Sequence, residues 1–307
     1  MSAARNALAR LRPRGGFPYT SPTWPRAVER PPVERTTGIE YDTEWARRYS
    51  VRLARAVVLD TVGKGLAKVV AAPVVSGVDR IAGVANPVVF AANHASHADT
   101  PLILTSLPER FRHRSIVAAA ADYFFDRRWK SVMWAFLLNA VPIERNRPSP
   151  KSARTFLGLL QDGWSLVIYP EGGRSPHGWG QRHTAGAAYL AQRSGVPVVP
   201  IHLAGTRRIL PKDGHRLRPS RTYVTFGTPL SPAEGEDPRE FAVRIERAIS
   251  VLADEHTTDW WRARRRAAAG STPALGGPDA GAWRRTWALR DHLRTPRAQR
   301  EWPNLRQ

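Results

Sequence analysis

Residues 87–102 read PVVFAANHASHADTPL, and this stretch indicates the class of fold. The apolar run over 87–92 indicates a buried strand, expected over 86–92, and it ends abruptly in the polar loop 93–99. Pro101 suits the first turn of a helix, with Thr100 as its N-cap. A strand that leads through a polar loop into a helix is the repeating unit of an α/β fold.

The same alternation of strands and helices continues along the chain. The two prolines of VPVVPIHL (196–203) suggest that this strand lies at the end or the edge of the sheet. We therefore predict an α/β domain over 80–256, with a mixed central sheet flanked by helices. The other strands are expected over 115–120, 166–169 and 221–227, and the helices over 102–107, 129–138, 152–162, 184–194 and 236–256.

Three further segments flank this domain. Residues 1–41 mix Arg and Pro with Gly and Ser, and we expect a disordered basic arm. Residues 42–79 begin with a helical pattern up to 75, which is amphipathic and carries Arg52, Arg55, Lys64 and Lys68. This helix either packs on its own domain or contacts a membrane. Residues 257–307 are expected to form a basic linker and a C-terminal tail, helical over 283–300.

The charge of the chain narrows the class of partner. The net charge is +21, which favours phosphates: nucleic acid, anionic lipid or phosphorylated metabolites. The absence of cysteine excludes thiol catalysis, thiolate metal sites and disulfides. We find no secretory signal and no apolar run long enough to span a bilayer, so any membrane contact is expected to be peripheral.

The loop 93–99 allows three interpretations. His94 and Asp99 could form a base with its orienting carboxylate, a pair that activates a hydroxyl group. His94, His97 and Asp99 could instead bind a metal ion, although zinc normally has three or four protein ligands at a different spacing. The third interpretation is a polar turn that caps a helix.

A second polar loop follows the strand expected over 166–169. It reads YPEGGRS (169–175), in which Gly172 and Gly173 let the backbone approach an anion. Arg174 offers a planar donor fork that suits a phosphate, and Glu171 could hold that fork or a substrate group. Taken alone, this loop is better explained as a glycine-rich turn with a surface salt bridge.

Four motifs in order resemble the 1-acylglycerol-3-phosphate acyltransferase family, the glycerolipid acyltransferases that carry an N-H-x-x-x-x-D motif. The resemblance covers about residues 80–250, and the four motifs together are far more specific than any one alone. They are NHASHAD (93–99), VPIER (141–145), EGGRS (171–175) and VPVVP (196–200).

The resemblance implies a role for each matched residue. His94 is the general base that takes the proton of the acceptor hydroxyl, and Asp99 orients it. The hydroxyl then attacks the acyl thioester directly, without an acyl-enzyme. The glycerol phosphate of the acceptor is held by Arg145, Glu171, Gly172, Gly173 and Arg174.

Two positions depart from the family pattern. Gly173 stands where the family often has Thr, and the stretch AADYFF (120–125) lacks the Lys of a family motif. The acceptor is therefore allowed to differ from simple lysophosphatidic acid.

The resemblance implies an enzyme on the inner face of the cell membrane, with a lysophospholipid acceptor and either acyl-CoA or acyl-ACP as donor. It implies no cofactor, no metal and no nucleic acid, and it favours contact of 42–79 with an anionic membrane. An acyl carrier protein is an allowed partner. The alternatives are a metal-dependent hydrolase that uses His94, His97 and Asp99, or a non-catalytic basic binder of membrane or nucleic acid.

Overall fold

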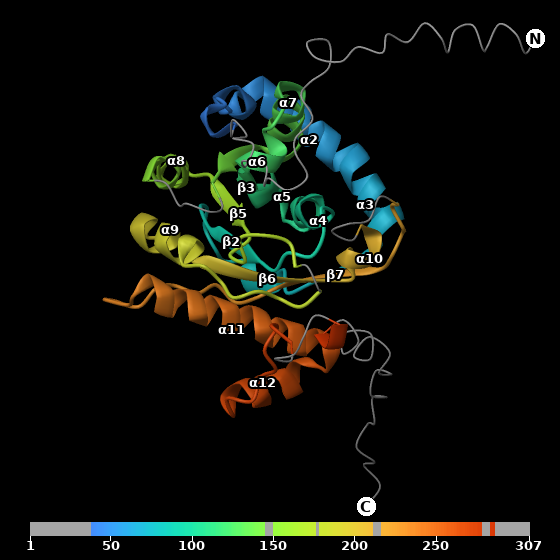
Figure 1. Ribbon diagram of the computed structural model, residues 1–307, viewed down its shortest axis with the longest axis vertical. Coiled ribbons are helices and arrows are strands. Elements are labelled where there is room, and N and C mark those ends of the chain that lie inside the picture. Colours follow the sequence, from blue (N-terminus) through green and yellow to red (C-terminus); the bar gives the residue numbers. More distant parts are fainter. Residues whose placement is uncertain (1–37, 145–149, 176–177, 211–215, 278–282, 286–307) are drawn as a thin grey trace, which may run out of the picture. The chain divides into compact units, whose positions relative to one another are not determined.

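A seven-stranded sheet forms the centre of the part of the chain that the structure describes, with the order β1-β7-β6-β2-β5-β3-β4 (Figure 1). The structure is a computed structural model, and it describes residues 38–144, 150–175, 178–210, 216–277 and 283–285. All neighbouring strands are parallel except β6 and β7, so the predicted mixed sheet is confirmed. The strands are β1 (Pro73–Ser76), β2 (Val89–Ala92), β3 (Ser115–Ala120), β4 (Ala140–Ile143), β5 (Ser165–Ile168), β6 (Val198–Ala204) and β7 (Thr222–Phe226).

Helices cover both faces of the sheet (Figure 1). The α-helices are α2 (Tyr49–Val58), α3 (Lys64–Ala71), α4 (Asp99–Ser106), α5 (Glu109–Arg112), α6 (Ala121–Phe124), α7 (Arg128–Leu138), α8 (Pro150–Gln161), α9 (Gly186–Ser194), α10 (Thr206–Ile209), α11 (Pro238–Thr257) and α12 (Trp260–Ala268). Short 3-10 helices are η1 (Gly38–Glu40), η2 (Glu44–Arg47) and η4 (Asp79–Ile81), and the π-helix η3 (Leu59–Gly63) joins α2 to α3.

The alternation of side chains along β2 builds two cores, one on each face of the sheet. Phe90 and Ala92 pack into the core beneath α4 and α7, and Val89 and Ala91 pack into the core beneath α8, α9 and α11. All four residues of β2 are fully buried. A strand with helices on both faces has no solvent side, which explains why 87–92 is apolar without alternation.

The helix predicted over 42–75 ends earlier than expected. It is divided into α2, η3 and α3, it stops at Ala71, and Ala72 takes a left-handed conformation with φ of 36°. Pro73 then opens the edge strand β1, a position where its missing N–H costs no ladder hydrogen bond. The sheet therefore begins before residue 80.

The expectation that 196–203 lies at a sheet edge is wrong, because β6 lies between β7 and β2. Pro200 is tolerated there because the β6–β7 ladder begins only at Ile201, where it pairs with Phe226. The Pro200 carbonyl accepts a hydrogen bond from Gly227 N at 2.8 Å, at the point where the chain leaves β7. The missing N–H thus falls outside the ladder.

Smaller differences concern three helix boundaries. The helix after β2 starts at Asp99 with Ala98 as its N-cap, so Thr100 lies inside the first turn and does not cap it. Gly38–Glu40 is helical, although 1–41 was expected to be disordered. α12 occupies the first part of the expected linker.

Other expectations lie outside the described residues, namely the arm over 1–37 and most of the helix over 283–300. Among the described residues, no helix is long and apolar enough to cross a bilayer.

Candidate active site

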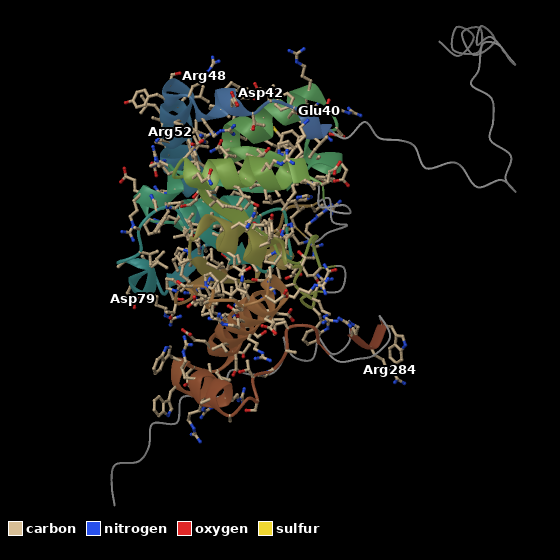
Figure 2. All side chains as sticks on the ribbon, turned by 90° about the vertical axis from the view of Figure 1, so that its left-hand side faces the viewer. Glu40, Asp42, Arg48, Arg52, Asp79 and Arg284 are labelled. Carbon is tan, nitrogen blue, oxygen red and sulfur yellow. The ribbon has the colours of Figure 1, made fainter. Side chains whose placement is uncertain are left out.

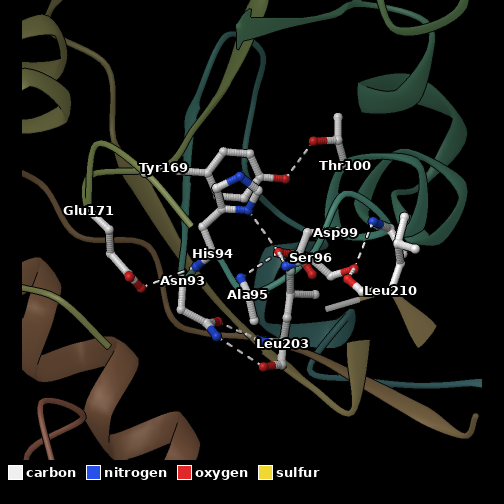
Figure 3. Close-up of polar contacts among 12 residues, drawn as sticks. Asn93, His94, Ala95, Ser96, Asp99, Thr100, Tyr169, Glu171, Leu203 and Leu210 are labelled. Carbon is white, nitrogen blue, oxygen red and sulfur yellow. Dashed lines mark hydrogen bonds and ion pairs between the residues drawn. The ribbon is translucent and has the colours of Figure 1, made fainter. Parts of the chain in front are cut away.

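The loop that follows β2 brings His94 and Asp99 into direct contact. The Nδ1 atom of His94 lies 2.8 Å from Oδ2 of Asp99 (Figure 3). Because an ionised carboxylate only accepts, Nδ1 carries the hydrogen and Nε2 keeps a lone pair. The His94 side chain is 15% exposed and lines a large cavity. The fold thus joins the two residues that the sequence predicts as base and orienting carboxylate.

Asp99 is fully buried, and one of its carboxylate oxygens accepts three hydrogen bonds from the loop 93–99. Besides the imidazole, Oδ2 accepts the backbone N–H groups of Ala95 at 2.7 Å and Ser96 at 2.8 Å (Figure 3). Asp99 is also the first residue of α4, where the helix dipole favours a negative charge. These donors compensate for part of the cost of burying the carboxylate, whose other oxygen, Oδ1, is buried without a hydrogen-bond partner among the described residues.

Two other side chains tie this loop to neighbouring segments (Figure 3). The Asn93 amide donates to the Leu203 carbonyl at 3.0 Å and accepts from Leu203 N at 2.7 Å. The Ser96 hydroxyl donates to the carbonyl of Leu210 at 2.8 Å. The asparagine of the N-H-x-x-x-x-D motif therefore fixes the loop against β6.

Tyr169 belongs to the site, although no sequence motif predicted it. It follows β5, which is the parallel neighbour of β2, and its ring stacks on the His94 imidazole with centroids 4.0 Å apart and planes at 18°. Its hydroxyl lies 2.7 Å from Thr100 Oγ1 (Figure 3). Burial raises the pKa of Tyr169 well above its usual value, so the phenol is neutral. Its place directly after a buried strand was the available signal.

Glu171 lies in the site but holds backbone groups. Its Oε1 accepts the N–H of His94 at 3.1 Å, and its Oε2 accepts the N–H of Gln181 at 3.2 Å. Burial raises the pKa of Glu171 to about 7, and the two N–H donors oppose this rise. The side chain is buried and does not line the cavity, so its predicted contact with the acceptor stays a prediction.

Gly172, Gly173 and Arg174 line the same cavity as His94. Gly172 has φ of 70°, a conformation that favours glycine, and the loop turns there toward Arg174. The Arg174 guanidinium carbon lies 5.8 Å from the centroid of the Tyr123 ring. The structure therefore brings these three predicted binding residues and the predicted base to one cavity, whereas Arg145 lies outside the described residues.

His97 points to an aromatic cluster and not to the pair of His94 and Asp99. Its ring stacks on Tyr123 with centroids 5.1 Å apart, and its Nε2 lies 3.0 Å from the Tyr123 hydroxyl. Phe124 packs edge-on against it. Among the described residues, no group of three His, Asp or Glu side chains could hold a metal ion. The geometry therefore does not favour the metal-dependent alternative.

The cavity beside His94 has a volume of about 660 Å³. Besides the polar groups already named, apolar side chains from several elements line it, which gives it room and surface for a hydrocarbon chain. They include Ala118, Phe124, Trp134, Leu138, Ile143 and Phe156.

Residues 73–204 match the model of the family described as Acyltransferase. We call this matched segment the acyltransferase domain, after the family that it resembles. The acyltransferase domain contains the sheet from β1 to β6, the pair of His94 and Asp99, and the glycine-rich loop over 171–175. The match agrees with the resemblance that the four motifs indicated.

Curated relatives resemble the acyltransferase domain in sequence. A 1-acyl-sn-glycerol-3-phosphate acyltransferase of Pseudomonas aeruginosa is 37% identical over 126 residues, which cover 39% of this chain and 48% of that protein. The Bacillus subtilis protein of the same name is 29% identical over 38% of this chain and 54% of its own length. The chain thus spans about half the length of these relatives.

A solved structure shares the fold of the acyltransferase domain. It is the 1-acyl-sn-glycerophosphate acyltransferase PlsC of Thermotoga maritima, with a TM-score of 0.54 and 25% sequence identity. The likeness covers 70% of this chain and 83% of that one. It therefore extends beyond the segment that matches the family.

Proposed function

We propose that this protein moves a fatty acyl group from an acyl thioester to the free hydroxyl of a lysophospholipid. In the simplest case it converts 1-acyl-sn-glycerol 3-phosphate to phosphatidic acid. The observation that carries the proposal is the His94–Asp99 pair at a largely apolar cavity of about 660 Å³. The names of the relatives support the same reaction class.

The reaction needs one base and no covalent intermediate. His94 Nε2 accepts the proton of the acceptor hydroxyl while that oxygen attacks the thioester carbonyl carbon. The carbon–oxygen bond forms, the carbon–sulfur bond breaks, and the imidazolium returns the proton to the thiolate. Asp99 stabilises the imidazolium through Nδ1–H. The products are an ester and a free thiol.

The cavity offers separate surroundings for the two ends of a lipid. Arg174 and the backbone of Gly172 and Gly173 lie on the wall near His94, where a phosphate would find donors. Trp134 and Leu138 of α7 form part of the apolar lining, where an acyl chain would lose its contact with water. Arg145 completes the phosphate site in this proposal.

We also propose that α2 and α3 lie on an anionic membrane, on the inner face of the cell membrane. One side of these helices carries an apolar stripe whose six members are 55% to 77% exposed: Tyr49, Leu53, Val57, Val62, Leu66 and Val69. Their spacing of three to five residues places them on one face. Exposed Arg48, Lys64 and Lys68 lie in the same helical segment, and Figure 2 shows Arg48 on it. Such a basic amphipathic surface suits an anionic bilayer.

Arg55 corrects one detail of the predicted membrane surface. It is buried, and its guanidinium donates to the carbonyls of Ala46, Ala135 and Phe136. Burial lowers the pKa of Arg55 to about 10. Because Ala135 and Phe136 belong to α7, Arg55 links α2 to a helix that lines the cavity.

A transfer assay with a panel of lysolipids, using acyl-CoA and acyl-ACP in turn, tests the reaction and identifies the donor. We expect transfer by the wild type, loss of transfer in His94→Ala, and near-normal transfer in His97→Ala. Both variants remove one imidazole from the same loop, so His97→Ala controls for damage to the loop. Full activity of His94→Ala would refute the proposed base.

A further inference from the structure

The backbone of His94 is held on both sides by the loop that follows β5. The His94 N–H donates to Glu171 Oε1 at 3.1 Å, and the His94 carbonyl accepts from Ser175 N at 2.9 Å. No covalent neighbour supplies these bonds, because Glu171 is 77 residues away in the chain. The position of the proposed base therefore depends on the 171–175 loop.

This loop is fixed in turn at its far end by residues 179–181. The Ser175 hydroxyl donates to the carbonyl of Trp179 at 2.5 Å. Gln181 N donates to the second oxygen of Glu171 at 3.2 Å. A displacement of Trp179 would therefore disturb both residues that hold the His94 backbone.

A segment beyond α12 packs against Trp179 and Gly180. The Trp179 indole N–H donates to the carbonyl of Arg285 at 2.8 Å, and Gly180 N donates to the carbonyl of Leu275 at 2.8 Å. The Arg285 guanidinium also donates to the Gly276 carbonyl at 2.6 Å. We call Leu275, Gly276, Gly277 and Arg285 the C-terminal brace.

The fit of the brace leaves no room for side chains at two glycines. A Cβ at Gly277 would lie 2.3 Å from Cδ2 of Trp179, and a Cβ at Gly180 would lie 2.8 Å from Cβ of Leu275. Both distances are shorter than real Cβ contacts allow. The indole N–H of Trp179 therefore donates to the carbonyl of Arg285, while its ring packs directly against the backbone of Gly277.

We propose that Trp179 is a positioning residue for the acyl transfer, and that the C-terminal brace holds it in place. The inference rests on the proposed function, because it takes His94 as the base. Trp179 does not line the cavity, so it acts through Ser175, Gln181 and Glu171. The brace lies outside the segment that matches the acyltransferase family, which ends at residue 204.

The test compares two substitutions in the full-length chain, Gly277→Ala and Gly270→Ala. Both glycines have a positive φ, of 68° and 66°, so both variants strain the backbone, but only the first places a methyl group against the indole, and the second places one in open space with nothing within 4 Å. We expect Gly277→Ala to lower kcat by about 10- to 100-fold with little change in KM, because small misplacements of a catalytic group have effects of this size. Gly270→Ala should keep the wild-type kcat and KM, because it adds the same backbone strain without a contact to the indole.

Hydrogen exchange separates positioning from a general loss of stability. In Gly277→Ala we expect faster exchange of the amide hydrogens of His94, Ser175 and Gln181, while core strands such as β2 exchange at the wild-type rate. If Gly277→Ala does not fold, Trp179→Phe decides, because it removes the indole N–H without adding a clash. That variant should show the same pattern with a smaller loss of kcat.

The outcomes distinguish this inference from the proposed function. An active wild type with unaltered kcat and exchange in Gly277→Ala, or in Trp179→Phe where Gly277→Ala does not fold, would overturn the role of Trp179 and leave the reaction intact. A wild type without any acyl transfer would overturn the proposed function itself.

Discussion

One oxygen atom, Oδ2 of Asp99, joins the His94 imidazole to the backbone of its own loop. It accepts three N–H groups at 2.7 to 2.8 Å, from Ala95, Ser96 and His94. An atom that accepts three donors fixes both the fold of the loop and the tautomer of the imidazole. The spacing between His94 and Asp99 therefore has a structural reason. The loop must curl back so that Asp99, the first residue of α4, lies beside the imidazole of His94.

We predict that Asp99→Asn loses most activity but keeps the fold. The amide can accept at one atom only, and its NH₂ group would favour the wrong tautomer of His94. In Ser-His-Asp enzymes the equivalent change lowers kcat by about 10⁴-fold, and we expect at least about 10²-fold here. Steady-state kinetics beside a circular dichroism spectrum tests this, and an Asp99→Asn variant with near-wild-type kcat would contradict it.

We predict that the titration of Glu171 makes stability depend on pH. The pKa of Glu171 is raised from 4.5 to about 7 by burial, so between these values the folded protein holds a proton that the unfolded chain releases. The free energy of unfolding should therefore fall as the pH rises through this window and level off above it. The contribution is on the order of 3 kcal/mol.

Urea denaturation of the wild type and Glu171→Gln at pH 5 and pH 8 measures this effect. A glutamine side chain does not titrate. The free energy of unfolding of the wild type minus that of Glu171→Gln should therefore be smaller at pH 8 than at pH 5. Equal differences at the two pH values would show that burial does not shift Glu171 as described.

The strands and long helices around the sheet were predictable because their patterns are local. The strand expected over 115–120 matches β3, and the helix expected over 236–256 matches α11 within two residues. Each has an apolar face or run that a buried element requires. The prolines led to the wrong prediction that β6 is an edge strand. The free-energy cost of a proline in a strand depends on where the neighbouring strand ends, and the sequence does not show this.

The site was predictable only in part, and for the same physical reason. His94 and Asp99 are five residues apart, so a local motif records their contact. Tyr169 and Thr100 meet across 69 residues, and Trp179 and Arg285 across 106. Contacts between residues so far apart in the sequence depend on the tertiary fold. No motif of fixed spacing in the sequence records them. Arg55 was misassigned to the surface because the amphipathic pattern does not show that α7 packs over it.

We predict that the apolar stripe on α2 and α3 is needed for binding to vesicles. The double variant Leu66→Ser with Val69→Ser removes two side chains that are 61% and 75% exposed. Little buried area is lost, so the melting temperature should change little, while binding to anionic vesicles should fall severalfold. Val243→Ser on α11 is the control, because Val243 is also exposed, at 44%, but lies outside the stripe. Equal binding of both variants in a sedimentation assay would contradict the role of the stripe.

The order of the strands places the whole site at the carboxyl ends of the parallel strands. His94 follows β2, Glu171 follows β5, and Glu144 follows β4, all at carboxyl ends of strands that run parallel. The chain leaves β5 toward β6 on one side and leaves the neighbouring strand β3 toward β4 on the other, and ligands of open α/β sheets bind at such a switch point. The cavity therefore lies where the topology predicts it, and α2 reaches its lining through the contact of Arg55 with α7.

The net charge of +21 raises the question of whether membrane binding is a general attraction or a specific docking on α2 and α3. The matched variants Lys68→Gln and Arg247→Gln each remove one exposed positive charge, the first from α3 and the second from α11, which packs on the opposite face of the sheet. A basic residue near an anionic bilayer contributes about 1 kcal/mol, so docking predicts about fivefold weaker vesicle binding for Lys68→Gln only. The deficit should vanish near 1 M salt, where the Debye length is about 3 Å. Equal losses in both variants at low salt would instead assign the binding to the charge of the whole molecule.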